Sequence, residues 1–322
     1  MKFGLSNTVS DMFALIAGNL TKADLSIFHE FAPAPAGGGH QFLRGFVREA
    51  EAKGVLVENN RVSRVTRACL FNSFNFSETR LLRTHRKSVL YVHRVDGPID
   101  VYRGREDGVD KRIHFISKKV AAKTIFQSHY SLEKHLELGM DFPKPEVILN
   151  AADPAIFHSY GRIPFLRNRK IRLIAASWSN NLNKGSAVYK WLDENLDWDR
   201  FDFTFVGRSQ IQFKNIHILP PVDSYRLANL LREHDIYITA SKHDPCSNSL
   251  IEALTCGLPA VYLQSGGHPE IVKHAGAGFE AAEQIPGVLD QVVDSYEAFQ
   301  SQISIPSMRE VSESYLKVLE LL

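Results

Sequence analysis

Residues 241–261, SKHDPCSNSLIEALTCGLPAV, carry the most informative pattern in the chain. An apolar strand is predicted just before them, at residues 235–239, and a tight polar turn then opens a short helix. The helix is predicted to stop at Gly257, because glycine readily adopts the left-handed angles of a C-terminal cap. A second apolar strand follows at residues 260–263. Strand, loop, helix start and strand in this order are typical of the nucleotide crevice of an open parallel sheet.

The start of this helix has the chemistry of a diphosphate site. Unpaired backbone amides and the positive end of the helix dipole attract anions. Asp244 lies in the turn and Glu252 inside the helix, with seven residues between them, and both carboxylates suit the hydroxyls of a sugar or a ribose. Ser249 and Glu252 also match a capping box, which needs no ligand. The pattern alone therefore leaves a ligand site and a plain helix cap open.

A second helix start of this kind follows the next strand, where residues 266–272 read GGHPEIV. With it, the chain resembles the GT-B-type retaining glycosyltransferases of family 4, often called "group 1". The donor motif of that family is an acidic residue, seven residues and then Glu, followed by a Gly-Gly-x-Pro-Glu turn. This chain carries Asp244 where most members carry the first Glu, and Asp is shorter by one methylene group.

Composition is that of a globular protein. The 322 residues are 44% hydrophobic and 23% charged, and this length suits two domains. A net charge of +2 does not indicate nucleic-acid binding. Three cysteines (Cys69, Cys246 and Cys256) are too few for a disulfide framework or a zinc site, which favours a reducing cytoplasm. The first residues show no signal-peptide pattern, and no apolar run approaches the ~20 residues of a membrane span.

The first half of the chain begins with a predicted strand at residues 25–28, a glycine-rich turn at residues 37–39 and a helix to about residue 53. This is the first unit of a doubly wound sheet, and glycines allow a ligand close to the backbone, although a plain flexible turn has the same composition. The resemblance implies that Gly38 and Gly39 face the donor phosphate and the acceptor.

Another strand, at residues 88–93, ends in His93. The carboxyl end of a strand is where α/β enzymes place chemistry, but a lone histidine there is more often a satisfied structural residue. The resemblance implies instead that His93 is catalytic and lies close to the donor sugar. Residues 94–104, RVDGPIDVYRG, resemble a loop over the acceptor cleft in a subset of these enzymes, which implies acceptor-side roles for Arg94, Asp96 and Arg103.

In the second half, a strand at residues 171–176 leads into the loop SWSNNLNKG at residues 177–185. A lysine in such a loop is placed to neutralise a diphosphate, unless it is only a solvated loop residue. The resembling family carries an Arg and, five residues on, a Lys-Gly, and both cations bind the donor diphosphate. Lys184 matches, but Ser179 stands at the position of the Arg. Arg208, in the loop after a later strand, is a candidate substitute.

The resemblance implies an α/β protein with the GT-B fold, in which two Rossmann-like doubly wound parallel-sheet domains face a central cleft. Residues 1–165 are expected to form the acceptor-side domain and residues 166–307 the donor-binding domain. A helix at residues 308–322 is expected to pack back on the first domain. Residues 159–170 are polar, are interrupted by Gly161 and Pro164, and are predicted to be the hinge.

The implied activity is transfer of a sugar from a nucleotide-diphosphate sugar to an acceptor hydroxyl, with retained anomeric configuration, in glycan or polysaccharide assembly. Glu252 would accept ribose hydroxyls and Asp244 would act beside the reacting carbon. Lys184 and the amides of Ser247, Asn248 and Ser249 would offset charge on the departing diphosphate. No Asp-x-Asp metal motif is expected in the chain and the resembling family needs no metal, so neither a metal nor a cofactor beyond the donor is expected. Two alternatives remain: a sugar-nucleotide 2-epimerase on the same fold, and a non-catalytic nucleotide-sugar-binding subunit.

Basic residues cluster in the first half of the chain. A solvated helical face explains such a cluster, and weak docking to an anionic membrane or a lipid-linked acceptor is the alternative. The expected partners are thus a nucleotide sugar and a glycan or lipid-linked acceptor, with no nucleic acid, in the cytoplasm or at the inner face of the membrane. The cluster consists of Arg61, Arg64, Arg67, Arg80, Arg83, Arg86, Lys87, Lys111, Arg112, Lys118, Lys119 and Lys123.

Overall fold

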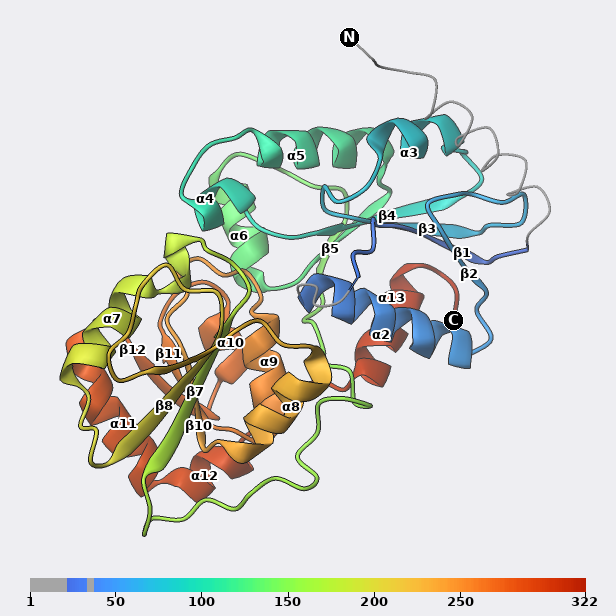
Figure 1. The fold of residues 1–322 in the computed structure, drawn as a ribbon. Helices are drawn as coiled ribbons and strands as arrows, with labels where there is room; N and C mark the ends of the chain where they lie inside the picture. The colour runs from blue at the N-terminus through green and yellow to red at the C-terminus, as the bar shows by residue number, and fades with distance from the viewer. Residues whose placement is uncertain (1–21, 34–37) are drawn as a thin grey trace.

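The computed structural model describes residues 22–33 and 38–322, which form two lobes, each built on one six-stranded sheet (Figure 1). Every strand pairing in the two sheets is parallel. The strand order is β2-β1-β3-β4-β5-β6 in the first sheet and β12-β11-β10-β7-β8-β9 in the second. Both orders are doubly wound, which confirms the predicted α/β class with two Rossmann-like sheets.

In the first lobe, strands alternate with helices except between β2 and β3, because parallel neighbours need crossover connections. Helices α3 and α5 cover one face of the sheet, and α2 covers the other (Figure 1). The strands are β1 (Leu25–Phe28), β2 (Val57–Asn59), β3 (Ala68–Asn72), β4 (Leu90–Val95), β5 (Lys123–Phe126) and β6 (Pro145–Val147). The helices are α2 (Gly38–Ala52), α3 (Glu78–Thr84), α4 (Ile99–Arg103), α5 (Val109–Val120) and α6 (His129–Glu137).

The second lobe repeats this alternation. Its strands are β7 (Ile171–Ser177), β8 (Phe201–Gly207), β9 (His217–Leu219), β10 (Ile236–Thr239), β11 (Ala260–Leu263) and β12 (Gly276–Phe279). Its helices are α7 (Ser186–Asn195), α8 (Ser224–Glu233), α9 (Asn248–Thr255), α10 (His268–Val272), α11 (Ile285–Asp294) and α12 (Tyr296–Ser301), with short 3-10 turns η1 (Leu182–Lys184) and η2 (Ala282–Gln284). Within the described residues, no helix is both long and apolar enough to cross a membrane.

The central strands are apolar on both faces because both faces are covered by helices. In β3, Leu70 packs in the cluster that contains α2 residues, whereas Cys69 and Phe71 pack in a second cluster on the opposite face. All five residues of β3 are buried. The sequence of such a strand is therefore a continuous apolar run, and it does not show which residue points to which face.

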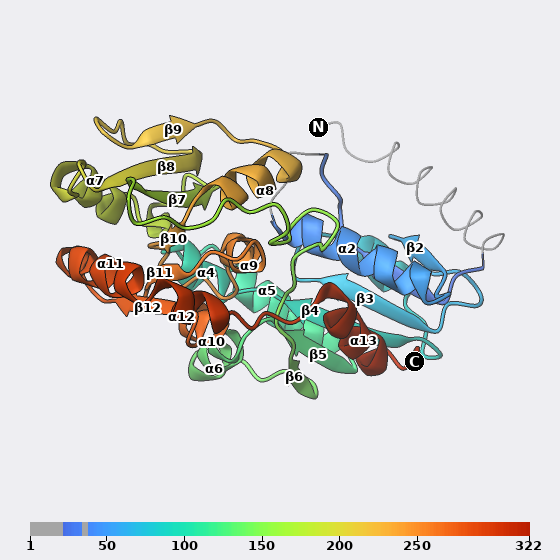
Figure 2. The ribbon, with the colours of Figure 1, turned by 90° about the horizontal axis from the view of Figure 1, so that it is seen from below.

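The C-terminal helix α13 (Met308–Val318) returns to the first lobe and lies beside α2 (Figure 2). The ring of Tyr315 lies 5.6 Å from that of Phe42 and 5.3 Å from that of Phe46, both on α2. Gly45 lets the helices approach, because a β-carbon there would lie 2.8 Å from the Met308 methyl group. The second lobe is thus fastened to the first by a helix that follows it in the chain.

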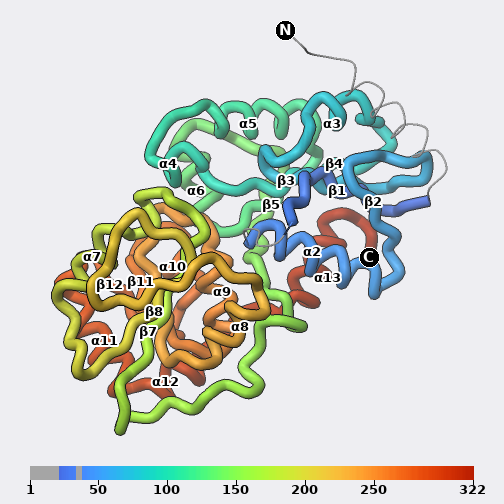
Figure 3. Tube along the Cα trace, in the orientation of Figure 1, coloured from blue at the N-terminus to red at the C-terminus, as the bar shows by residue number. Residues whose placement is uncertain are grey.

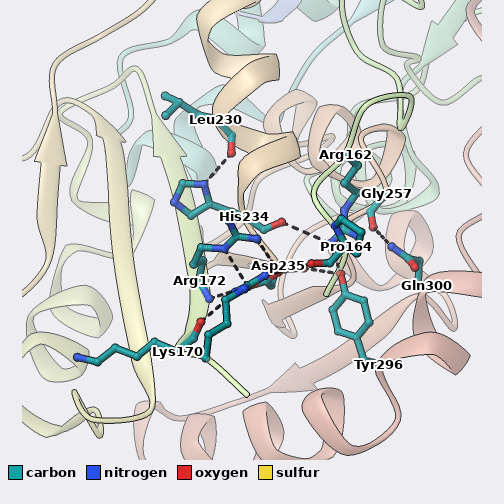
Figure 4. Close-up of polar contacts among 11 residues, drawn as sticks. Arg162, Pro164, Lys170, Arg172, Leu230, His234, Asp235, Gly257, Tyr296 and Gln300 are labelled. Carbon is teal, nitrogen blue, oxygen red and sulfur yellow. Dashed lines mark hydrogen bonds and ion pairs between the residues drawn. The ribbon is translucent and has the colours of Figure 1, made fainter. Parts of the chain in front are cut away.

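The segment at residues 159–170, predicted to be a hinge, is fastened to the second lobe at the amino ends of its strands (Figures 3 and 4). Asp235, just before β10, accepts hydrogen bonds from Arg169 at 2.6 Å and from the Arg172 backbone at 2.8 Å. Arg162 binds the Tyr296 hydroxyl, which donates to the Asp235 carbonyl at 2.9 Å. Burial raises the pKa of the Asp235 carboxyl, but the two arginines outweigh this and lower it. This ionic cluster lies at the opposite edge of the sheet from the cavity described below.

Candidate active site

A cavity of about 390 Å³ lies where the carboxyl ends of the two sheets face each other. In the second sheet, β7 and β10 are neighbours although they are not consecutive, so the order of strands reverses between them. The loops that follow these two strands diverge at that point and leave room for a ligand. The cavity is lined by Gly38, Gly39, Asp96, Ile99, Tyr102, Gln127, Ala176, Ser177, Trp178, Ser179, Lys184, Asp244, Pro245, Cys246, Asn248, Ser249 and Glu252.

Helix α9 begins at the wall of this cavity. Its N-cap is Ser247, and no side-chain cap to the first amides is found in the described part of the chain. The Ser247 hydroxyl instead lies 3.3 Å from that of Ser249. A capping box would need Ser249 as the N-cap, so the structure excludes that interpretation. Helix starts without a side-chain cap have the amides and the dipole to attract an anion, so a ligand site at α9 stays a prediction.

Glu252 presents a carboxyl group to the cavity from the second turn of α9. The residue is 7% exposed, and no hydrogen bond to its carboxyl is found among the described residues. Burial alone raises the pKa of this carboxyl to about 8. A buried acid without a protein partner gains most from a ligand that supplies hydroxyl groups.

Lys184 and Asp244 form an ion pair across the point where the strand order reverses, with Nζ 2.8 Å from Oδ2. Lys184 also lies over the ring of Tyr102, 5.0 Å from its centroid, so a residue of the first lobe contacts the lysine. Burial lowers the pKa of Lys184, but attraction to Asp244 and Tyr102 outweighs it and raises the pKa. Burial raises the pKa of Asp244, and Lys184 outweighs it and lowers the pKa. Both groups are therefore charged at neutral pH.

The Gly-Gly turn after β11 supports the Asp244 loop from behind. A β-carbon on Gly266 would lie 2.3 Å from the Asp244 carbonyl oxygen, and the Gly267 amide donates to that oxygen at 2.9 Å. Glu270 points away to the first lobe, where its two oxygens accept from the amides of His129 at 2.9 Å and Tyr130 at 3.0 Å. This segment was predicted to be a second anion-binding helix start. The structure shows instead a support for the loop and a contact between the lobes.

Gly38 opens α2 directly opposite α9. A β-carbon on Gly38 would lie 2.3 Å from the Asn248 β-carbon, so the approach of the lobes requires glycine here. Gly39 also lines the cavity, whereas Gly37 lies outside the described residues. Gly38 and Gly39 are thus the first residues of α2 and not part of a turn, and both lie at the wall shared by the two lobes.

His93 and Arg94 lie beneath the cavity and are not among the residues that line it. His93 is fully buried, and its Nε2 donates to the Ser73 carbonyl at 2.9 Å. Burial lowers the pKa of its ring to about 3, so the ring is neutral. Arg94 is also fully buried and donates to Asn72, Asp96, Asn150 and Tyr315.

The remaining predicted residues, Asp96, Arg103 and Arg208, lie at the margins of the cavity or outside it. Asp96 lines the cavity and receives a hydrogen bond from Arg94 at 3.3 Å. Arg103 pairs with Asp107 at 2.9 Å on the surface of the first lobe. Arg208 is exposed after β8, and in the described residues its side chain has no hydrogen bond or ion pair. It lines a smaller cavity together with Ser179 and Lys184, so it lies on the side of the site where Ser179 stands in place of the arginine that the resemblance implies.

Sequence reasoning missed Tyr102 and Gln127, which also line the cavity. Tyr102 closes it from the first lobe, and its carbonyl accepts from the side chains of Asn181 at 2.8 Å and Asn183 at 2.9 Å. The presence of Tyr102 in the predicted acceptor loop was a weak signal for this role. Nothing local in the sequence indicates that the loop of Lys184 is held by a residue about eighty positions earlier.

The expectation that the chain has no Asp-x-Asp sequence is wrong, because Asp197-Trp198-Asp199 lies between α7 and β8 at the amino edge of the second sheet. The Asp199 amide donates to the Asp197 carboxylate at 3.1 Å. The cavity lies at the opposite, carboxyl edge, so this pair of carboxylates does not reach it. No cluster of three or more metal-ligating side chains occurs in residues 22–33 and 38–322.

Two doubly wound parallel sheets that share one cavity at their carboxyl ends define the GT-B fold. A family model described as "Glycosyl transferases group 1" matches residues 210–297, which include α9, Glu252 and the Gly-Gly turn. An N-acetyl-alpha-D-glucosaminyl L-malate synthase from Bacillus anthracis is 31% identical over 85 residues, which are 25% of this chain and 22% of that protein. The match thus covers only a small part of that relative.

Solved structures with this fold match nearly the whole chain. A sucrose-phosphate synthase from Thermosynechococcus elongatus has a TM-score of 0.67 at 13% identity, over 94% of this chain and 95% of that one. The catalytic domain of starch synthase IV from Arabidopsis thaliana, bound to ADP and acarbose, has a TM-score of 0.68 at 12% identity, over 93% of this chain and 99% of that one. Anabaena HepE in complex with UDP-glucose has a TM-score of 0.65 at 14% identity, over 92% of this chain and 99% of that one. At these identities the similarity establishes the fold.

Proposed function

We propose that this protein is a retaining glycosyltransferase, which moves a sugar from a nucleotide-diphosphate sugar to an acceptor hydroxyl in glycan or polysaccharide assembly. The observation that carries the proposal is the Glu252 carboxyl, which has no partner among the described residues, in one cavity with Lys184 and the start of α9. An anion site, a cation and a hydroxyl acceptor are the groups that a nucleoside diphosphate needs. The group 1 match over residues 210–297 supports the same assignment.

In this proposal the diphosphate lies against the amides of Ser247, Asn248 and Ser249, where the helix dipole and Lys184 offset its charge. The ribose hydroxyls bind Glu252. Arg208 supplies the second cation from the neighbouring cavity, because Ser179 cannot. The charge that develops on the departing diphosphate is thus stabilised by groups that are in place before the reaction begins.

The sugar would lie toward the first lobe, between Asp244 and the start of α2. Asp244 would accept a sugar hydroxyl once the diphosphate has taken over Lys184. His93 would act only indirectly, from beneath the cavity, by holding the Ser73 carbonyl just after β3. The acceptor would enter beside Asp96 and Tyr102, with Arg94 and Arg103 as supports of that wall. No cofactor or metal beyond the nucleotide sugar is proposed.

We also propose a cytoplasmic protein with peripheral membrane contact. The three cysteines are free and buried, which fits a reducing compartment. On the outer face of α5, Phe115 is 61% exposed and Lys119 lies 5.5 Å from its ring centroid. A basic and aromatic surface of this kind suits anionic headgroups. Co-sedimentation of the wild type with phosphatidylglycerol vesicles, but not with phosphatidylcholine vesicles, would support this contact if Phe115→Ser loses it. Equal binding of the wild type and Phe115→Ser to phosphatidylglycerol would contradict it.

The function is tested by calorimetry with UDP and ADP, the nucleotides bound by the structural neighbours, followed by transfer assays with the sugar nucleotide of the base that binds. Binding, transfer to an acceptor and a product with the donor's anomeric configuration by NMR are expected. A new sugar nucleotide from donor alone would identify an epimerase. Binding without turnover across a panel of donors and acceptors would identify a non-catalytic subunit.

A further inference from the structure

Asn150 lies where the chain passes from the first lobe to the second. It follows β6 and is fully buried. Two residues later, Ala152 packs in the core cluster of the second lobe. The chain returns only before α13, where Ile303 and Ile305 pack on the second core and Met308 on the first. Asn150 is therefore at one of the places where the relative position of the lobes is set by the backbone itself.

The side-chain amide of Asn150 makes three hydrogen bonds, and they join the two lobes. Its Oδ1 accepts from Arg94 Nη2 at 2.9 Å, and its Nδ2 donates to Gln127 Oε1 at 2.7 Å. The same nitrogen donates to Asn248 Oδ1 at 3.0 Å, at the first residue of α9. A flipped amide would place its oxygen against two acceptors and its nitrogen against a guanidinium, so only one orientation satisfies all partners.

The two ends of this connection are fixed independently. Arg94 is held by Tyr315 of α13 at 3.1 Å and by Asn72 of β3 at 2.6 Å, and its guanidinium lies 4.7 Å from the centroid of the Phe42 ring. On the other side, Asn248 packs directly against Gly38, where even a β-carbon would clash with it. Gln127 and Asn248 line the cavity, whereas Asn150 does not.

We propose that Asn150 is a positioning residue that holds the amino end of α9 in register with the first lobe. The proposal rests on the function proposed above, in which that end of α9 binds the diphosphate. Asn150 touches no substrate. It acts through Asn248, so that the lobes close with the phosphate-binding amides facing Gly38 and the acceptor side. Losing it leaves the diphosphate site intact but lets the two halves of the reaction site move relative to each other.

Asn150→Asp separates this role from a merely structural one. The carboxylate still accepts from Arg94, and more strongly because it is charged. It has no hydrogen to donate to Gln127 or Asn248. Transfer is expected to fall by roughly tenfold to a hundredfold, since the buried Gln127 oxygen and the half-buried Asn248 oxygen both lose their donor. Nucleoside diphosphate affinity by calorimetry is expected to stay within about threefold, since Lys184 and Glu252 are untouched.

Three comparisons complete the test. Asn195→Asp makes the same change at the exposed end of α7, where Nδ2 donates to the Trp191 carbonyl at 2.8 Å, and should transfer like the wild type. Asn150→Ser keeps one hydroxyl donor and should recover part of the rate. In an Asn248→Ala background, Asn150→Asp should cost clearly less than in the wild type, because the shared contact is already gone.

Wild-type transfer by Asn150→Asp would overturn the inference and leave the proposed function standing, as would an undiminished penalty in the Asn248→Ala background. A wild-type protein that neither binds a nucleoside diphosphate nor transfers sugar would reject the proposed function first and this inference with it. If Asn150→Asp does not fold, the transfer rate of Asn150→Ser is compared with that of Asn195→Asp. A lower rate for Asn150→Ser would support the inference, and equal rates would overturn it.

Discussion

Lys184 and Asp244 are paired at 2.8 Å in the wall of the cavity, although they come from loops that follow different strands. The pair joins the loop after β7 to the loop after β10. Asp244 thereby neutralises the cation that a diphosphate is proposed to bind. Donor binding would therefore exchange one anion for another at Lys184 and free Asp244 for the sugar.

Asp244→Asn should separate binding from transfer. Without its carboxylate, Lys184 has no competing anion, so nucleoside diphosphate affinity should be unchanged or higher. Transfer should fall by roughly a hundredfold or more, because the charge beside the reacting carbon is lost. Calorimetry and initial rates measure the two effects. Asp290→Asn, which breaks a surface pair with Arg200 at 2.8 Å, serves as the matched control. Weaker nucleotide binding with normal transfer would contradict this assignment.

Glu252→Gln should stabilise the ligand-free protein at high pH. The pKa of Glu252 is about 8 in the fold and 4.5 in the unfolded chain. As pH rises through this window, the unfolded state releases a proton that the folded state keeps, so wild-type stability falls. Gln removes that penalty, which is on the order of a few kcal/mol at the upper end of the window.

Thermal midpoints at pH 5 and pH 8.5 check this prediction. The midpoint of Glu252→Gln minus that of the wild type should be near zero at pH 5 and positive at pH 8.5. The same variant should bind a nucleoside diphosphate less tightly, because its amide cannot accept both ribose hydroxyls as a carboxylate does. A difference in midpoint that does not change with pH would show that Glu252 is paired in the protein.

Glu270→Gln should loosen the contact between the lobes. The Glu270 carboxylate caps the amino end of α6 across the cleft, and a charge at this position of a helix contributes about 1 kcal/mol. The variant should be more open by small-angle X-ray scattering and should hydrolyse more donor when no acceptor is present, since closure excludes water. Glu297→Gln, at the surface pair with Arg167, is the control. Unchanged scattering and hydrolysis would show that the cap does not hold the lobes closed.

Transfer should need no added metal. The cations of the proposed site are Lys184 and Arg208, and the Asp197–Asp199 pair lies at the far edge of the sheet. Activity after dialysis against EDTA should therefore equal activity with added Mg²⁺ or Mn²⁺. A rate that disappears with EDTA and returns with one metal ion would contradict this prediction.

The donor half of the site could be predicted from the sequence because its groups lie close together in the chain. Asp244, the α9 amides and Glu252 lie within one strand-turn-helix segment, and Lys184 is in the corresponding loop of the neighbouring strand. The strand order that brings these loops together follows from the doubly wound pattern. The fold class was predictable for the same reason, since strands and helices alternate along most of the chain.

The contacts between the lobes could not be predicted in this way. Glu270 binds amides about 140 residues earlier in the chain, and Asn150 binds a side chain about a hundred residues later. No local pattern encodes such a partner. The depth of His93 and Arg94 was also hidden, because all but the first residue of β4 are buried and a strand covered on both faces has no apolar alternation.

A crystal structure of the protein with the nucleoside diphosphate that binds it tests the central claim most directly. The diphosphate should lie against the first amides of α9 and contact Lys184, with the ribose hydroxyls on Glu252. A nucleotide bound elsewhere, or an α9 entrance that stays closed to it while the protein still transfers sugar, would contradict the account.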